Sequence, residues 1–196
     1  SIIEDSEIHR EWLKAEISSD MRFSIVSGDR LGRKGVESVK QRRPSLVLLD
    51  FQLEDMTGLE VAKRIKTFDE NIKIFVITAH TEISIIERLI DDANVDAIAI
   101  KGSRYFQDNF ITAIGEVVNG GAYLDPSLLG KLRESNKLSG VNALTKREFE
   151  IFIQSASGKQ DAKIADDLCV ELAHVKNIKS KINKKIFSFV IVLILV

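Results

Sequence analysis

Five polar residues follow short apolar runs in the first part of the chain, and together their types suggest a single chemical site. They are Glu4, Asp5, Asp50, Thr78 and Lys101. Converging carboxylates repel one another and therefore favour binding of a hard divalent cation such as Mg²⁺. A lysine beside them can pair with a carboxylate or a phosphoryl oxygen, and a threonine hydroxyl can hydrogen bond to that oxygen. The alternative is that each residue is only a polar strand end at the solvent rim.

The elements that would position these residues alternate between strand and helix patterns. We predict strands at Ile2–Ile3, Phe23–Val26, Leu46–Leu49, Lys73–Ile77 and Ala97–Ile100, with helices near 6–17, 30–41, 58–66, 82–92 and 104–119. Such alternation predicts a doubly wound α/β sheet, whose ligand site lies at the carboxyl ends of its strands. The five polar residues all fall at strand ends in this arrangement. The pattern therefore favours one shared site over five unrelated surface residues.

The segments SIIEDSEIHREWL, LVLLDFQLEDMTGLEVAKRI, FVITAH and AIAIKG resemble the receiver domain of two-component response regulators, over residues 1–121. The resemblance implies a flavodoxin-like, five-stranded parallel sheet with Asp50 as the phosphoacceptor of a sensor histidine kinase. It also implies that Glu4 and Asp5 hold Mg²⁺ together with Asp50. Thr78 would then be the switch hydroxyl, and Lys101 would contact the phosphoryl group.

Two positions depart from that family pattern. Leu53–Glu54 stands where most relatives have a Met-Pro pair, which predicts a less rigid loop after the phosphoacceptor. Ile98 stands where relatives usually carry a Tyr or Phe on the fifth strand. Without an aromatic ring at that position, the usual coupling of Thr78 to the far face of the domain is not expected.

Composition and charge narrow the class of protein. The single Cys169 favours a reducing compartment and is expected to be a small buried hydrophobe. No run of eighteen apolar residues is present, which predicts no membrane span. The resemblance to two-component regulators implies a cytoplasmic location, in a bacterial cytosol or a plastid stroma. A Walker loop, a dinucleotide fingerprint and a nucleophile elbow are all missing, so we do not expect an enzyme with a diffusible substrate.

The charge is divided unevenly between the two parts of the chain. Residues 1–130 carry a net charge of −6 and residues 131–196 a net charge of +5, within a total of −1. This asymmetry predicts two modules, the second facing a polyanion. The alternative is ordinary variation of surface charge. We place the receiver at 1–121, a linker at 122–143, a small helical domain at 144–186 and an atypical hydrophobic tail at 187–196.

The helical domain begins with a predicted capping box of Thr145 and Glu148, and further helices are expected near 160–168 and 171–186. Its sequence LTKREFEIFIQSASGKQDAKIADDLCVELAHVKNIKSKI resembles the helix-turn-helix domain of NarL/FixJ (LuxR-type) regulators. The resemblance implies a DNA-binding transcription regulator that forms a homodimer when active. The implied contacts to double-stranded DNA are Lys176, Asn177, Lys179, Ser180, Lys181 and Lys184.

Several residues of this domain depart from the LuxR-type pattern. Asp166–Asp167 would oppose DNA phosphates if they faced them, and Glu171 and His174 replace the usual Ser and Thr at the start of the recognition helix. For the tail we keep three interpretations: a replacement dimerisation helix, a truncated or frameshifted end, and a membrane-touching segment.

The sequence as a whole predicts a two-component response regulator that is phosphorylated on Asp50 and controls transcription. Two alternatives stay open at this point. One is a phosphorylation-independent regulator, and the other is a signalling adaptor that has lost DNA binding.

Overall fold

The computed structural model describes residues 1–128, 131, 145–156 and 159–186 of the 196-residue chain. The chain divides into two compact units, Ser1–Gly120 and Gly121–Val196, and each is described by itself. Most of the expected linker and the whole hydrophobic tail lie outside the described residues, so the finer domain boundaries stay predictions. No helix in the described part is long and apolar enough to cross a membrane.

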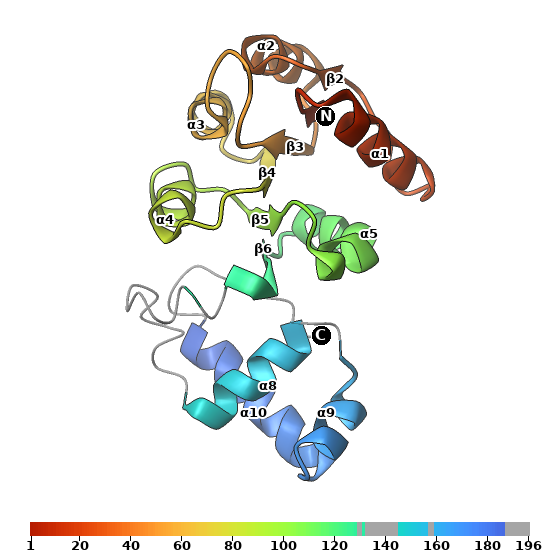
Figure 1. Ribbon diagram of the computed structural model, residues 1–196, viewed down its shortest axis with the longest axis vertical. Helices are drawn as coiled ribbons and strands as arrows, with labels where there is room; N and C mark the ends of the chain where they lie inside the picture. The colour runs from red at the N-terminus through yellow and green to blue at the C-terminus, as the bar shows by residue number, and fades with distance from the viewer. Residues whose placement is uncertain (129–130, 132–144, 157–158, 187–196) are drawn as a thin grey trace. The chain divides into compact units, whose positions relative to one another are not determined.

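The first unit is built around a β-sheet with helices packed on both faces (Figure 1). The sheet has six strands in the order β2-β1-β3-β4-β5-β6; β1 to β5 belong to this unit and pair in parallel, and β6 follows its last residue, Gly120. The strands are β1 (Ile2–Ile3), β2 (Gly28–Asp29), β3 (Leu46–Asp50), β4 (Lys73–Thr78), β5 (Ala97–Ile100) and β6 (Tyr123–Leu124). The helices are α1 (Glu7–Ser18), α2 (Gly32–Arg42), α3 (Gly58–Phe68), α4 (Ile83–Asp91) and α5 (Arg104–Val118).

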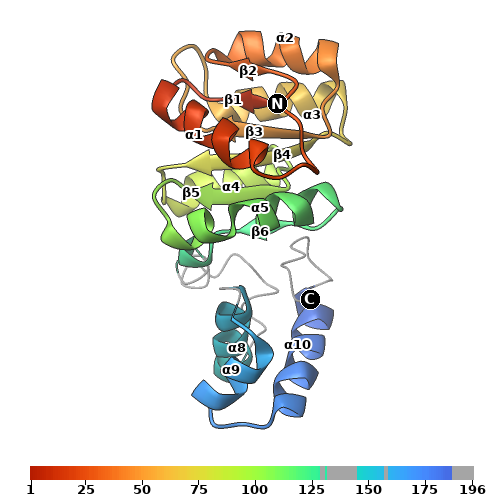
Figure 2. The ribbon, with the colours of Figure 1, turned by 90° about the vertical axis from the view of Figure 1, so that its right-hand side faces the viewer.

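The arrangement of the helices confirms the doubly wound α/β prediction. Helices α1 and α5 lie on one face of the sheet, and α3 and α4 lie on the other (Figures 1 and 2). All five residues of β3 are buried, as a central strand covered on both faces requires. Each fully buried aliphatic side chain contributes about 1.5–3 kcal/mol to folding. The central strands therefore hold their carboxyl ends firmly in place.

The number of strands and the place of the second strand differ from the sequence prediction. Strand β6 falls inside the expected linker, so the sheet has six strands and not five. Strand β2 is Gly28–Asp29, whereas we expected Phe23–Val26. In the observed register, Ile2 of β1 lies opposite Gly28. Phe23–Val26 therefore lies before the start of β1 and does not pair with that strand.

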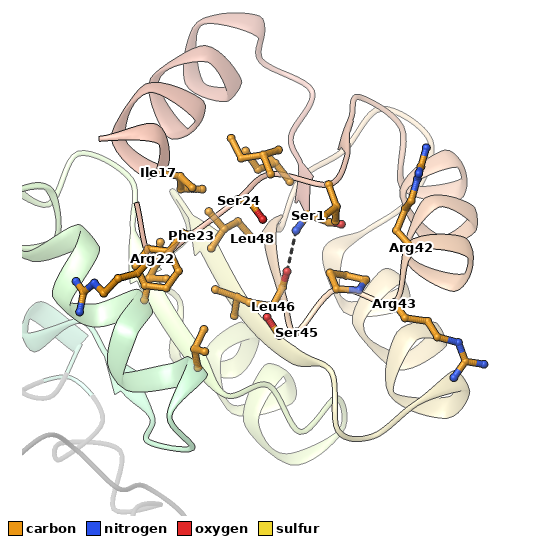
Figure 3. A pocket seen from close by; sticks show the side chains of 16 residues that line it. Ser1, Ile17, Arg22, Phe23, Ser24, Arg42, Arg43, Ser45, Leu46 and Leu48 are labelled. Carbon is orange, nitrogen blue, oxygen red and sulfur yellow. Dashed lines mark hydrogen bonds between the residues drawn. The ribbon is translucent and has the colours of Figure 1, made fainter. Parts of the chain in front are cut away.

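The segment Phe23–Val26 instead lines a cavity of about 310 Å³ beside the first residue (Figure 3). The Ser1 amino group donates a hydrogen bond to Leu46 O there, at 2.8 Å. The five polar strand-end residues do not line this cavity.

The second unit contains the three expected helices, α8 (Lys146–Ala156), α9 (Asp161–Asp167) and α10 (Leu172–Ile186). The capping box at the start of α8 is present: Glu148 N donates to Thr145 Oγ1 at 3.2 Å, and Thr145 N donates to Glu148 Oε2 at 2.7 Å. Among the described residues of these three helices, the buried apolar side chains are Ile151, Phe152, Ile164, Ala165, Val175 and Ile178. Leu172, the first residue of α10, is 41% exposed.

Cys169 lies in the turn between α9 and α10 and is exposed. The prediction that it is a buried residue is therefore wrong. The φ angle of Cys169 is 51°, in the left-handed region that disfavours residues with a Cβ. The sequence pattern did not reveal this, because it does not distinguish a small core residue from a turn residue.

We expect Cys169→Gly to raise the free energy of unfolding by about 0.5–1 kcal/mol, because glycine adopts a positive φ without a steric cost. Urea denaturation of the full chain, followed by far-UV circular dichroism, measures the change. Cys169→Ala is the matched control, since it removes the thiol but keeps the Cβ. Equal stability of the Gly and Ala variants would contradict the argument.

Candidate functional site

The five polar residues meet at the carboxyl edge of the sheet. Asp50 and Thr78 are the last residues of β3 and β4, and Lys101 follows β5 directly. Glu4 and Asp5 follow β1, which lies beside β3 with Ile3 opposite Leu49. This parallel register is what brings residues far apart in the sequence into one cluster.

The three carboxylates are close enough to share a cation. One oxygen from each of Glu4, Asp5 and Asp50 lies within 4.8 Å of the other two. Glu4 and Asp50 are only 1% and 4% exposed. Glu4 Oε2 is buried and accepts no hydrogen bond from the described residues, although Lys101 Nζ lies 3.1 Å away as an ion pair. A hard divalent cation fits this all-oxygen set.

Lys101 is the basic partner of the cluster. Its Nζ donates to Asp50 Oδ2 at 2.7 Å and to Glu4 Oε1 at 3.1 Å. Its backbone amide donates to Thr78 O at 2.7 Å, which fixes the start of the lysine side chain against β4. The ammonium group therefore neutralises part of the acidic charge and stays beside the Asp50 oxygen.

The environment of Asp50 opposes its ionisation. Burial raises the pKa of Asp50 from 3.8 to about 6, although the hydrogen bond from Lys101 opposes the shift; the nearby charge of Glu4 adds to it. The unfolded chain releases this proton near pH 3.8, whereas the folded chain holds it until about pH 6. The cost of folding with a charged Asp50 is therefore absent below pH 3.8 and complete above pH 6.

We accordingly expect Asp50→Asn to stabilise the protein by about 1–3 kcal/mol at pH 8 without divalent cations. The gain should disappear at pH 3.5, where both states are protonated at this residue. Urea denaturation at the two pH values tests this. Asp108→Asn, at an exposed position of α5, is the control. A loss of stability at pH 8 in Asp50→Asn would show that the Lys101 contact outweighs the cost of burial.

Thr78 is fully buried at the end of β4. Its Oγ1 accepts a hydrogen bond from the backbone amide of His80 at 2.9 Å. Ile98, one strand away on β5, is 2% exposed and lies opposite Val76. An apolar side chain thus fills the position at which the resemblance implied an aromatic ring.

Two groups near the cluster were not found from the sequence. The backbone amide of Gln52 donates to Asp50 Oδ1 at 3.2 Å. Arg10 Nη1 donates to the backbone carbonyl of Glu4 at 2.7 Å, which holds the acidic pair from helix α1. A backbone amide carries no sequence signal, and the charged Arg10 looked like any exposed residue of an amphipathic helix.

The residues expected to contact DNA differ in their surroundings. Lys176, Asn177 and Lys181 are exposed on α10. Lys179 is less accessible to DNA than these three residues, because its side chain is only 12% exposed and its Nζ donates a hydrogen bond to Asp161 at 2.7 Å. This ion pair with Asp161 would compete with a DNA phosphate for Lys179, whose role as a DNA contact stays a prediction. The side chains of Ser180 and Lys184 lie outside the described part of the structure.

Asp166 and Asp167 lie at the end of α9. Asp167 forms ion pairs with Lys159 and Lys163, and these hydrogen bonds hold the pKa of Asp167 below its usual value. Its charge is therefore largely offset. Asp166 and Glu171 are exposed acidic residues near the start of α10.

Comparisons with known proteins point to one group of signalling proteins. Residues 1–103 match the model of the response regulator receiver domain. The response regulator protein VraR of Staphylococcus saprophyticus is 26% identical over 187 residues, which cover 92% of this chain and 88% of VraR. A crystal structure of a LuxR-family DNA-binding response regulator from Staphylococcus aureus has 26% identity and a TM-score of 0.55, covering 60% of this chain and 96% of that one.

A structure of the RcsB response regulator of Salmonella typhimurium is similar over almost the whole chain. It covers 95% of this chain and 90% of RcsB, with a TM-score of 0.62 and 17% identity. At that identity the similarity shows the fold alone. The similar region includes the helical unit that follows the α/β unit.

Proposed function

This chain belongs to the response regulator receiver domain family, and from that membership we propose that Asp50 accepts a phosphoryl group from a sensor histidine kinase. The observation that carries the proposal is the buried Asp50 carboxylate, 2.7 Å from Lys101 Nζ and grouped with two further carboxylates. The proposed setting is the bacterial cytosol, since the relatives named above come from bacteria.

In the proposed reaction, a carboxylate oxygen of Asp50 attacks the phosphorus of a phosphohistidine. A P–O bond forms as the P–N bond breaks, and the histidine ring leaves with the electron pair of that bond. Lys101 lies beside Asp50 and would neutralise charge on the transferred oxygens. Glu4, Asp5 and Asp50 would hold Mg²⁺, which would supply further charge neutralisation.

Thr78 would respond to the new phosphate. Its hydroxyl would donate to a phosphoryl oxygen, while its oxygen accepts the amide of His80. The phosphate shifts the protein between two states only by the difference in its interaction with them. Because Ile98 replaces the aromatic ring, we propose that β4 and the segment after it carry the change.

The output would be DNA binding by the helical unit, as a homodimer, with control of transcription. Helix α10 is the second helix of a helix-turn-helix pair and presents exposed Lys176, Asn177 and Lys181. Amide and lysine side chains suit base edges and phosphates in the major groove. The Staphylococcus aureus relative is a DNA-binding response regulator, and the RcsB structure concerns interaction with DNA, which supports the same role here.

The phosphoacceptor role is tested by incubating the protein with acetyl phosphate and Mg²⁺ and measuring its intact mass. We expect the wild type to gain about 80 Da, the mass added by one phosphoryl group (HPO₃), and Asp50→Ala to gain nothing. The adduct should be lost at alkaline pH, as an acyl phosphate is. A folded wild type that binds Mg²⁺ but gains no mass would favour the phosphorylation-independent regulator.

The output role is tested by fluorescence anisotropy with a labelled random-sequence DNA duplex. We expect binding to weaken steeply with salt, and Lys176→Ala to reduce the slope of log K against log salt by about 1. Lys34→Ala, at an exposed position of α2, is the control.

A signalling adaptor without DNA binding is the second candidate function. The ion pair between Lys179 and Asp161 and the exposed acidic side chains of Asp166 and Glu171 favour it. An absence of salt-dependent binding by the phosphorylated protein would support the adaptor and contradict the DNA-binding role.

A further inference from the structure

The loop after the phosphoacceptor, residues 51–57, is attached to helix α2 by a carboxylate. Asp55 Oδ1 accepts the backbone amide of Gly32 at 2.7 Å, and Asp55 Oδ2 accepts that of Arg33 at 3.0 Å. Gly32 and Arg33 are the first two residues of α2, whose amides have no partner within the helix. The N-cap residue Leu31 offers no side-chain acceptor. Asp55 therefore caps α2 from a different segment of the chain.

The residues on both sides of Asp55 make contacts with the same region. Glu54 forms an ion pair with Arg30, which lies just before α2. Met56 packs so closely on Gly32 that a Cβ there would lie 2.6 Å from Met56 Cγ. Three consecutive loop residues thus dock onto the start of α2. These contacts hold the loop in place. It is the same loop in which Leu53–Glu54 replaces the Met-Pro pair of most relatives.

Electrostatics favours the same attachment. The first turn of α2 contains Arg33 and Lys34 and no acidic residue, which is unfavourable at the positive end of a helix dipole. Asp55 supplies the missing negative charge. Although burial alone would raise the pKa of Asp55, hydrogen bonds from Arg33 and Gly32 hold it below its ordinary value.

The base of the loop is joined to the phosphoacceptor. The amide of Gln52 donates to Asp50 Oδ1 at 3.2 Å, and Gly58 N donates to Phe51 O at 2.6 Å. Gln52 and Thr57 form an antiparallel bridge that closes the loop. The loop is therefore closed at its base, beside the Asp50 carboxylate, and anchored near its tip on α2.

We propose that Asp55 is a positioning residue for phosphorylation: by capping α2 from the loop, it keeps the Gln52 amide on the Asp50 carboxylate. The proposal rests on the proposed role of Asp50 as the phosphoacceptor. The competing explanation is that Asp55 only stabilises α2.

A variant at Leu31 separates the two explanations. Leu31 has the extended backbone of an N-cap residue, with φ −106° and ψ 140°, and is 39% exposed. Leu31→Ser can therefore cap α2 locally without reattaching the loop. The experiment compares the wild type, Asp55→Ala, Leu31→Ser and the double variant, by urea denaturation and by the rate of mass gain with acetyl phosphate and Mg²⁺.

We expect Asp55→Ala to lower the urea midpoint and to slow phosphorylation about tenfold, since small displacements of positioned groups have large effects on rate. The double variant should regain most of the midpoint but not the rate. Asp69→Ala is the matched control: Asp69 also accepts a loop amide, that of Asn71, but lies at the far end of α3. Its phosphorylation rate should equal that of the wild type.

Recovery of the rate together with the midpoint in the double variant would overturn the inference, as would a wild-type rate in Asp55→Ala. A wild type that takes up no phosphate would instead overturn the proposed function, and this inference with it. The two failures are thus distinguished by the wild-type measurement alone.

Discussion

Replacing Lys101 with methionine is expected to slow phosphorylation of Asp50 by about 100-fold or more, because it removes a preorganised positive charge from the transferred group. The reason lies in the geometry, since Lys101 Nζ is 2.7 Å from Asp50 Oδ2 and the lysine side chain is only 19% exposed. Methionine keeps much of the length and apolar volume of lysine. The time course of mass gain with acetyl phosphate and Mg²⁺ measures the rate.

A second measurement distinguishes this effect from a general loss of structure. Without its ammonium group, the cluster of Glu4, Asp5 and Asp50 gains net negative charge, so Lys101→Met should still bind Mg²⁺. Lys73→Met is the matched control, because Lys73 also forms a partly buried ion pair, with Asp96 at 2.9 Å, at the opposite end of β4. Phosphorylation of Lys101→Met at the rate of Lys73→Met would contradict the proposed role of Lys101.

The strand-end residues could be found from the sequence because a parallel sheet gathers its carboxyl ends at one edge. Asp50 and Thr78 needed only the recognition of β3 and β4, whose long apolar runs are unambiguous. The same reasoning failed for β2. Phe23–Val26 is as apolar as a strand, but β1 pairs with the later residues Gly28 and Asp29 instead. Apolar pattern predicts the tendency to form a strand, whereas pairing depends on the neighbouring strand.

Other features depend on contacts between segments and have no local pattern. Asp55 is one more acidic residue in a charged loop until α2 is placed beside it. Lys179 looked like a surface cation in a lysine-rich helix, but α9 brings Asp161 within 2.7 Å of it. Both residues belong to polar pairs whose partners lie in another element. Periodicity predicts which face of a helix is apolar, but not which charged residue meets a partner across a helix boundary.

Gly58, the first residue of α3, packs tightly against the backbone of Asp50. A Cβ at this position would lie 2.5 Å from the Asp50 carbonyl oxygen and 2.6 Å from Phe51 Cα. Both atoms belong to the backbone, so no side-chain rotation relieves the clash. The capping box of Thr57 and Glu60 fixes α3 from the other side. Any added methyl group must therefore move the chain that carries Asp50.

We expect Gly58→Ala to lower the free energy of unfolding by about 2–4 kcal/mol. The phosphorylation rate should fall by about 100-fold, because the Asp50 carboxylate is displaced from Lys101. Gly115→Ala is the matched control: Gly115 lies within α5, and a Cβ added there would lie 4.0 Å from Phe23 Cζ, an ordinary van der Waals distance. That change should raise the stability by about 0.5–1 kcal/mol and leave the rate unchanged, because alanine favours a helix interior over glycine. Urea denaturation and the mass-gain assay measure both quantities. A Gly58→Ala protein that keeps wild-type stability and rate would mean that the α3 start can move away from Asp50 at no cost, which the backbone contacts oppose.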